Sequence, residues 1–157
     1  RARPVLAGID DTLNLDPADV EARITPRTKA IVAVHMLGNP ARIDELKAVA
    51  DRHGVALTED AAQAFGATFR GAWVGSFGAA GIFSFNEYKT ITCGDGGMLV
   101  TDDEDLYQYL TPHMETWPHL TIQVNDTRIP ITGNGFAATG RHGPTARHYR
   151  QTKAPIM

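Results

Sequence analysis

An acid, an amide, a hydroxyl and an amine follow one another in the middle of this chain. They are Asp60, Gln63, Ser84 and Lys89. A pyridine nitrogen requires a carboxylate partner, a ring hydroxyl requires a hydrogen-bond donor, a phosphate requires hydroxyl and backbone N–H groups, and an aldehyde requires a lysine amine. The four groups together therefore suit a single cofactor, pyridoxal phosphate.

The segments around these residues predict the fold class. Short apolar runs alternate with amphipathic stretches, which is typical of βα units around a mostly parallel sheet. Residues 29–35 are largely apolar and β-branched, which predicts a strand buried on both faces. Residues 43–50 place their apolar side chains on one helical stripe, and Gly54 ends that helix. The sequence thus predicts an α/β fold, with helices flanking a mostly parallel sheet.

The candidate residues lie where two predicted strands end. Residues 55–58 form a strand that stops just before Asp60, and ligands of open α/β sheets usually bind beyond the carboxyl ends of strands. Residues 80–85 form another strand, with Ser84 near its end. Lys89 follows in a loop. The acid is therefore expected at the edge of the sheet where ligands bind.

Further elements are predicted on both sides of this region. They are a helix that begins after Asp16-Pro17, a glycine-turned hairpin at 68–78, a strand at 96–101 and a helix at 103–110. Beyond Pro112 the periodicity fades into Pro, His, Thr and Gly. We therefore expect a partial cofactor-binding large domain at residues 1–112 and a divergent or poorly ordered tail at 113–157.

Composition excludes several classes of function. With 157 residues, 43% apolar and 21% charged, the chain is expected to form a globular domain with a core. A net charge of −3 does not suit a nucleic-acid or anionic-membrane partner. Cys93 is the only cysteine and is expected to be a buried thiol, and the six histidines lack metal-ligand spacing, so no disulfide and no metal are expected. A reducing cytoplasm fits this composition. The absence of an initial Met suggests a fragment.

Several short blocks, in this order and spacing, carry a family resemblance. They include Thr25-Pro26-Arg27-Thr28-Lys29, Glu59-Asp60-Ala61-Ala62-Gln63, Gly75-Ser76-Phe77-Gly78, Phe83-Ser84-Phe85 and Lys89. Residues from about Pro4 to Leu110 resemble the large domain of the pyridoxal-phosphate-dependent sugar aminotransferases of the DegT/DnrJ/StrS type, which are fold-type I aminotransferases.

The resemblance implies a role for each candidate residue. Asp60 is expected to pair with the pyridine nitrogen, Gln63 to bond the ring hydroxyl and Ser84 to bind the phosphate. Lys89 is expected to hold the cofactor covalently and to move the substrate proton. Some sugar dehydratases of the family carry His at this last position, so the lysine favours transamination.

The resemblance also implies substrates and an assembly. The amine donor is expected to be an amino acid, with glutamate as the first choice. The acceptor is expected to be a keto-sugar, linked to a nucleotide. Because the active site of the family forms between two subunits, a homodimer is expected.

Two alternatives stay open. The first is a non-catalytic fragment of such an enzyme that cannot hold the cofactor, because the family's phosphate-binding glycine loop and ring-stacking aromatic residue have no counterpart in this chain. The second is a dehydrogenase-like nucleotide-binding module. It requires a Gly-rich turn between strand and helix followed by a ribose-binding acid, which the sequence does not show. His35, at the end of a predicted strand, is expected to be a packed histidine.

Overall fold

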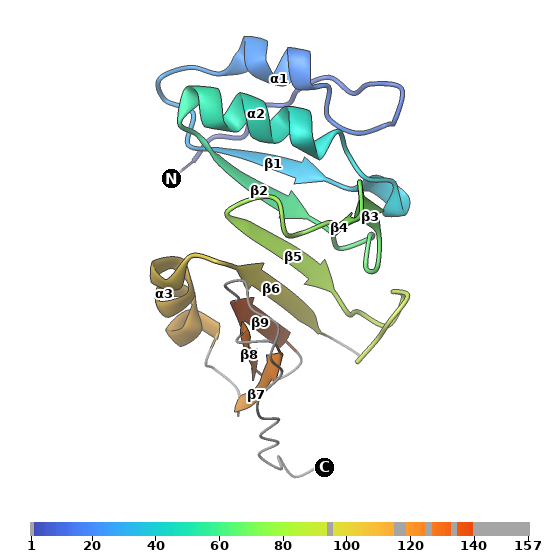
Figure 1. The fold of residues 1–157 in the computed structure, drawn as a ribbon, viewed down its shortest axis with the longest axis vertical. Coiled ribbons are helices and arrows are strands. Elements are labelled where there is room, and N and C mark those ends of the chain that lie inside the picture. The colour runs from blue at the N-terminus through green and yellow to red at the C-terminus, as the bar shows by residue number, and fades with distance from the viewer. Residues whose placement is uncertain (1, 94–95, 115–118, 125–126, 133–134, 140–157) are drawn as a thin grey trace.

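The computed structural model describes residues 2–93, 96–114, 119–124, 127–132 and 135–139 (Figure 1). Its helices are α1 (Pro17–Arg23), α2 (Ile43–His53) and α3 (Glu104–Met114), with a short 3-10 turn at Met36–Gly38. Its strands are β1 (Ala30–Val34), β2 (Ala56–Asp60), β3 (Thr68–Phe69), β4 (Ala72–Trp73), β5 (Ala80–Ser84), β6 (Gly97–Thr101), β7 (His119–Val124), β8 (Thr127–Thr132) and β9 (Gly135–Thr139).

The strands form a mixed sheet, which confirms the predicted α/β class. The order within the described residues is β1-β2-β5-β6-β9-β8-β7, and β3 pairs with β4 separately. The pairs β1–β2 and β2–β5 are parallel, as is β6–β9, whereas β6 runs antiparallel to β5. The carboxyl ends of β1, β2 and β5 consequently lie at one edge of the sheet (Figure 1).

The helix α2 covers one face of this parallel part, and α1 packs against α2. At the start of α1, Asp16 accepts a hydrogen bond from the Ala18 backbone N–H (2.9 Å), as its capping sequence predicts. The α2 helix packs on β1 and β2, and its apolar stripe joins a core that includes Ile31 and Leu57. It ends at Gly54, whose φ of 62° is the left-handed conformation that glycine adopts without strain. The amphipathic helix predicted from the sequence is confirmed.

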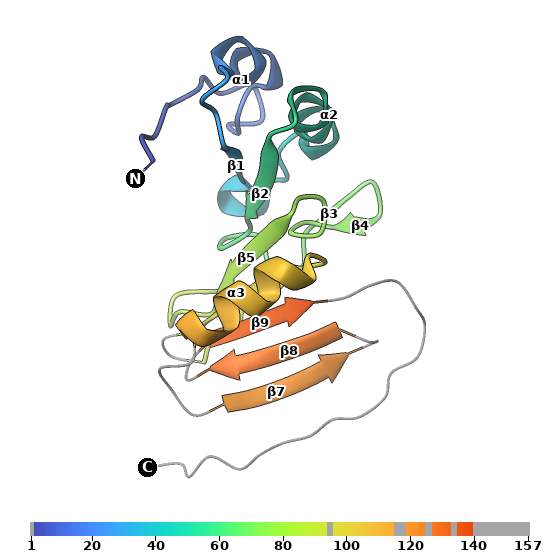
Figure 2. The same ribbon diagram turned by 90° about the vertical axis from the view of Figure 1, so that its left-hand side faces the viewer.

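The prediction that β1 is buried on both faces is wrong. Ile31 and Ala33 are buried against α2, whereas Val32 between them is 55% exposed. β1 is the edge strand among the described strands of this sheet, and α2 packs on one of its faces (Figure 2). In the described part of the chain, the other face of β1 is therefore open.

The elements after β2 largely follow the sequence pattern. The β3–β4 hairpin and strands β5 and β6 occupy predicted positions. The helix α3 begins after Asp103, whose carboxylate accepts from the Leu106 N–H (3.0 Å), and it runs to Met114 instead of ending at 110. Among the described helices, none has the length and apolar content needed to cross a bilayer.

Three strands lie in the region where no regular structure is predicted. β9 pairs with β6, and β8 and β7 continue the sheet beyond it (Figure 2). The alternation in β7 and β8 brings Leu120 opposite Ile131 and Ile122 opposite Ile129, which is a period-2 signal. Pro130 within β8 masks that signal, because proline lacks the N–H that a central strand donates. The division of the chain at residue 112 stays a prediction.

Candidate functional site

Strand register determines which candidate side chains share a face of the sheet. Asp60, the last residue of β2, pairs with Ile82 of the parallel strand β5. In-register neighbours point to the same face, and residues two apart on a strand do so as well. Asp60, Ile82 and Ser84 therefore point to one face, at the carboxyl ends of β2 and β5. Glu59 and Phe83 point to the opposite face.

The Asp60 carboxylate has one oxygen fixed and one available. One oxygen accepts from the backbone N–H of Ala62 (3.0 Å), and the backbone carbonyl of Asp60 accepts from the His35 N–H (3.0 Å). The second carboxylate oxygen receives no hydrogen bond from the residues that the structure describes. A half-buried carboxylate with one unbonded oxygen can accept a hydrogen bond from a protonated ring nitrogen.

The amide of Gln63 is oriented by a backbone group. The Leu37 N–H donates to the Gln63 side-chain oxygen (3.0 Å), and a backbone N–H can only donate, so the oxygen must face it. The Gln63 NH₂ group is thereby left to donate elsewhere. It is exposed, and within the described structure it bonds nothing. This is the donor that a ring hydroxyl requires.

Ser84 and Lys89 flank the turn that leaves β5. The Ser84 hydroxyl lies 3.4 Å from the Asn86 N–H, a long contact that leaves it able to bind another group. The bonds that close the loop include those from the Lys89 N–H to the Asn86 carbonyl and from the Cys93 N–H to the Phe85 carbonyl, both 3.0 Å. Lys89 is half-buried, and its amine makes no ion pair with the described residues.

The structure brings these residues to one region but does not assign their roles. Asp60 and Ser84 share a face, Gln63 follows Asp60 by one turn, and Lys89 lies in the loop that leaves the same edge (Figure 1). Their cofactor roles stay predictions. Cys93, expected to be a buried thiol, is exposed because it lies in this surface loop and not in a strand.

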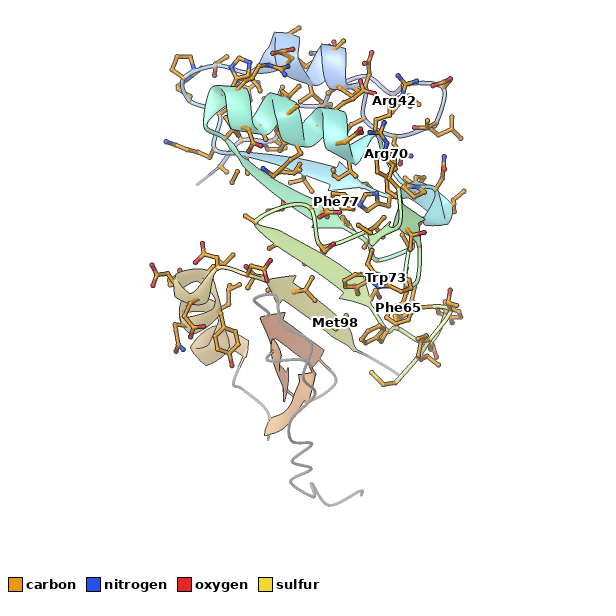
Figure 3. The ribbon with its side chains drawn as sticks, viewed as in Figure 1. Arg42, Phe65, Arg70, Trp73, Phe77 and Met98 are labelled. Atoms are coloured by element: carbon orange, nitrogen blue, oxygen red, sulfur yellow. The ribbon has the colours of Figure 1, made fainter. Side chains whose placement is uncertain are left out.

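Aromatic side chains border the same edge. Phe65 contacts Phe83 and Phe85 edge to face, with ring centroids 5.9 Å and 5.6 Å apart. Phe65 is 40% exposed and Trp73 is 63% exposed, and both lie near the ends of β2 and β5 (Figure 3). These rings give the edge an apolar border beside its polar groups.

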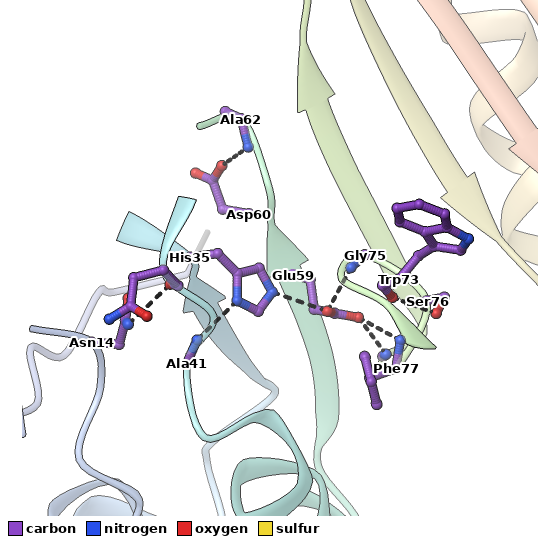
Figure 4. A network of polar contacts seen from close by, with 12 residues as sticks. Asn14, His35, Ala41, Glu59, Asp60, Ala62, Trp73, Gly75, Ser76 and Phe77 are labelled. Carbon is purple, nitrogen blue, oxygen red and sulfur yellow. Dashed lines mark hydrogen bonds and ion pairs between the residues drawn. The ribbon is translucent and has the colours of Figure 1, made fainter. Parts of the chain in front are cut away.

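Sequence reasoning missed a buried hydrogen-bond network behind Asp60 (Figure 4). The Glu59 carboxylate accepts four hydrogen bonds. Their donors are His35 Nε2 (3.0 Å) and the backbone N–H groups of Gly75 (2.7 Å), Phe77 (2.6 Å) and Gly78 (2.8 Å). His35 has no exposed surface and Glu59 is 1% exposed. One signal was available in the sequence: Glu59 follows the apolar run of β2, at a position that faces the core. A charged side chain buried there requires hydrogen-bond partners.

The tautomer of His35 follows from its second contact. The Ala41 N–H donates to His35 Nδ1 (3.1 Å), so Nδ1 is an acceptor and the neutral ring carries its hydrogen on Nε2, toward Glu59. Burial alone raises the pKa of the Glu59 carboxyl. The bonds from His35 and the three backbone N–H groups outweigh burial and hold that pKa below its ordinary value of 4.5.

This pKa shift predicts how stability depends on pH. The folded state holds the Glu59 pKa below its unfolded value, so its contribution to the free energy of unfolding is complete above about pH 4.5. It is lost as the pH falls further, through the lower pKa that the carboxyl has in the folded state, where the buried carboxylate becomes protonated. Urea unfolding between pH 7 and 3 should therefore show a steeper loss for the native chain than for Glu59→Gln, measured from each variant's own value at pH 7. The exposed Glu87→Gln serves as control, and equal slopes for all three chains would contradict the prediction.

No metal site competes with this interpretation in the described ranges. Groups of three or more His, Cys, Asp or Glu side chains that could hold an ion do not occur there. The edge instead offers an unpaired carboxylate oxygen, two amide N–H donors, a hydroxyl and an amine. This set matches a ligand with a basic ring nitrogen, a ring hydroxyl, a phosphate and a carbonyl, and so fits pyridoxal phosphate.

Comparison with known proteins agrees with this chemistry. Residues 1–116 match the sequence model of the DegT/DnrJ/EryC1/StrS aminotransferase family. An aminotransferase from Psychrobacter cryohalolentis is 42% identical (TM-score 0.68), over 70% of this chain and 28% of that protein. DesI, solved in the presence of its TDP-sugar product, is 47% identical (TM-score 0.67), over 71% and 29%. GDP-4-keto-6-deoxymannose-3-dehydratase with a trapped PLP–glutamate adduct is 37% identical (TM-score 0.64), again over 71% and 29%. This chain thus spans less than a third of the structures it matches.

Proposed function

Since the chain belongs to the DegT/DnrJ/EryC1/StrS aminotransferase family, we propose that it forms the cofactor-binding part of an enzyme that transfers an amino group to a keto-sugar. Aminotransferases of this family use pyridoxal phosphate. The observation that supports the proposal best is the pair of oriented groups at the carboxyl end of β2. The free oxygen of Asp60 and the free N–H donors of Gln63 are the two partners that the cofactor ring requires.

Each residue of the site has a separate role. Bound pyridoxal phosphate supplies an electron sink for the substrate carbon. Lys89 would hold the cofactor through its amine, and its Nζ would be the group that carries a proton at the reacting carbon. Asp60 keeps the ring nitrogen protonated. Gln63 donates to the ring hydroxyl, and Ser84 donates its hydroxyl to the phosphate.

The substrates of the related proteins guide a finer proposal. DesI was solved with a TDP-sugar product and the dehydratase with PLP and glutamate. We therefore propose a nucleotide-linked keto-sugar as acceptor and glutamate as amine donor for this enzyme. A homodimer is part of the proposal. Leu37, 80% exposed and bonded through its N–H to Gln63, offers an apolar contact for a second copy beside the site.

The test begins with cofactor binding. Purified chain is titrated with pyridoxal phosphate, the visible absorbance band of lysine-bound cofactor is recorded, and the complex is reduced with borohydride and digested. We expect the cofactor mass on the peptide that contains Lys89 and not on the one that contains the exposed Lys47. No band, or a label spread over surface lysines, would contradict the proposal and favour the non-catalytic fragment.

A second measurement separates transamination from dehydration, which the related dehydratase performs. With glutamate and a nucleotide-linked keto-sugar, an aminotransferase forms 2-oxoglutarate and an amino-sugar in equal amounts. A dehydratase instead releases water from the sugar. The lysine at position 89 favours the first outcome, because a dehydratase of the family with His at that site has no amine to bind the cofactor.

Replacing the acid of the site tests its role in charge stabilisation. A carboxylate about 4 Å from a protonated ring nitrogen is worth about 4 kcal/mol at an effective dielectric of about 20. We expect Asp60→Asn to lower the rate of the half-reaction with glutamate by about a thousandfold, since each 1.4 kcal/mol is about tenfold. Single-turnover kinetics measure this rate. Asp51→Asn, on the exposed face of α2, is the matched control, and a similar loss in both variants would refute the assignment.

A further inference from the structure

The network behind Asp60 has a function beyond filling the core. We propose that Glu59 is a positioning residue: its carboxylate fixes the end of β2 and thereby holds the Asp60 carboxylate toward the cofactor site. This inference rests on the proposed function for its consequence in catalysis. Its geometry rests only on contacts within the chain.

The first step is the alternation of side chains along β2. Glu59 and Asp60 are consecutive, so they point to opposite faces of the sheet. Glu59 lies on the covered face, where it is 1% exposed, and Asp60 lies half-buried on the other. A rotation of the backbone at this strand end would move both side chains together. Whatever holds Glu59 therefore also holds Asp60.

The second step is the strength of that hold. Glu59 receives its four hydrogen bonds from two separate segments, the end of β1 and the 75–78 loop. Hydrogen bonds to a charged acceptor are worth more than neutral ones, and the loss of one leaves a buried charge unsatisfied. Three of the donors are backbone N–H groups, which cannot change rotamer. The carboxylate is therefore confined on the rear face.

The third step connects this network to Asp60 directly. His35 donates its side-chain N–H to Glu59 and its backbone N–H to the Asp60 carbonyl (both 3.0 Å). On the other side of the strand end, the Ala61 N–H donates to the Ile82 carbonyl (2.8 Å). Asp60 thus lies between two backbone bonds, and Glu59 holds one of the two partners in place (Figure 4).

The first experiment uses the chain without cofactor. Amide hydrogen exchange is measured at Ala61 and Ala62, and the ¹³C chemical shift of the Asp60 carboxyl carbon is recorded at pH 7. Glu59→Gln leaves an amide NH₂ group facing N–H donors. We therefore expect exchange at Ala61 and Ala62 to rise about ten times more than exchange at the α2 amides, and the Asp60 carboxyl ¹³C shift to change. The matched control is Leu46→Ala, which removes a buried side chain of α2. Exchange is compared at equal free energy of unfolding. To reach it, urea is added to the native chain and to whichever of the two variants is more stable.

A conservative pair at His35 adds a rescue. Gln at position 35 keeps an N–H donor at the reach of Nε2, whereas Leu provides none. We expect His35→Gln to preserve the Asp60 carboxyl ¹³C shift and His35→Leu to change it as Glu59→Gln does. If Glu59→Gln and Leu46→Ala give the same exchange pattern and the same Asp60 ¹³C shift, Glu59 only stabilises the core and the inference is wrong.

The second experiment adds pyridoxal phosphate. We expect Glu59→Gln to weaken its binding up to about a hundredfold, the effect of misplacing a site group, but to have little further effect in the Asp60→Asn background. Fully additive effects would overturn the inference. If the native chain binds no cofactor, the proposed function fails, while the hydrogen-exchange and ¹³C shift data still decide whether Glu59 positions Asp60.

Discussion

Lys89→Ala should retain the fold and lose covalent cofactor binding entirely. Alanine carries no amine, so nothing at this position can bond the cofactor carbonyl or carry a proton on nitrogen. Lys89 lies in the loop between β5 and β6, whose closing bonds are made by backbone groups. The substitution should therefore change the melting temperature little.

The measurements separate the two effects. The visible band, the borohydride-stable mass on the 89-containing peptide and amino transfer from glutamate should all be absent in Lys89→Ala. Lys89→Arg retains a positive charge but should fail equally, because a protonated guanidinium is no nucleophile at neutral pH. Lys47→Ala, in the exposed Lys47–Asp51 pair of α2, should behave like the native chain. Transamination that persists in Lys89→Ala would place the reactive amine elsewhere.

Gly81→Ala should lower the free energy of unfolding by about 4 kcal/mol or more, which would leave a domain at the low end of the usual stability range only marginally folded. A Cβ at position 81 would lie 2.2 Å from the Gly75 carbonyl oxygen and 2.5 Å from its Cα. The obstacle is backbone, so no rotamer change can relieve it. The 75–78 loop would have to move away from β5, and that movement breaks its bonds to the buried Glu59 carboxylate.

The size of this effect follows from both terms. Overpacking costs about 1–3 kcal/mol, and each bond lost to a buried charge costs about as much again. The sum is about 4 kcal/mol or more, against a total stability of about 5–15 kcal/mol for a typical domain. Urea unfolding measures it. The control is Gly66→Ala, which meets nothing within 4 Å but has a φ of 81°, so it should cost only about 1–2 kcal/mol. Equal losses in the two variants would show that the backbone contact at Gly81 is not the cause.

Several elements could be predicted because their signals are local. Residues that are close together in the chain carry the signals of the Asp16-Pro17 cap, the apolar stripe of α2 and the β-branched strands. The structure has these elements at the predicted positions. The strand β8 escaped prediction because Pro130 lacks the N–H that a central strand donates, although Ile129 and Ile131 on either side keep the period-2 pattern. The burial of β1 was mispredicted for a different reason. An apolar run is compatible with a strand buried on both faces, but only the order of the strands in the sheet reveals that β1 is at its edge.

The sequence alone determined the chemistry that this chain offers, because the residue types at 60, 63, 84 and 89 and their spacing are local facts. The tertiary structure decided how those groups are presented. Strand register put Asp60 and Ser84 on one face, Leu37 turned the Gln63 amide, and a loop some 16 residues away along the chain supplied hydrogen-bond donors to the Glu59 carboxylate. Such contacts join segments whose separation carries no periodic pattern. They form only when the sheet folds, because a charge that is removed from water must be hydrogen-bonded within the protein.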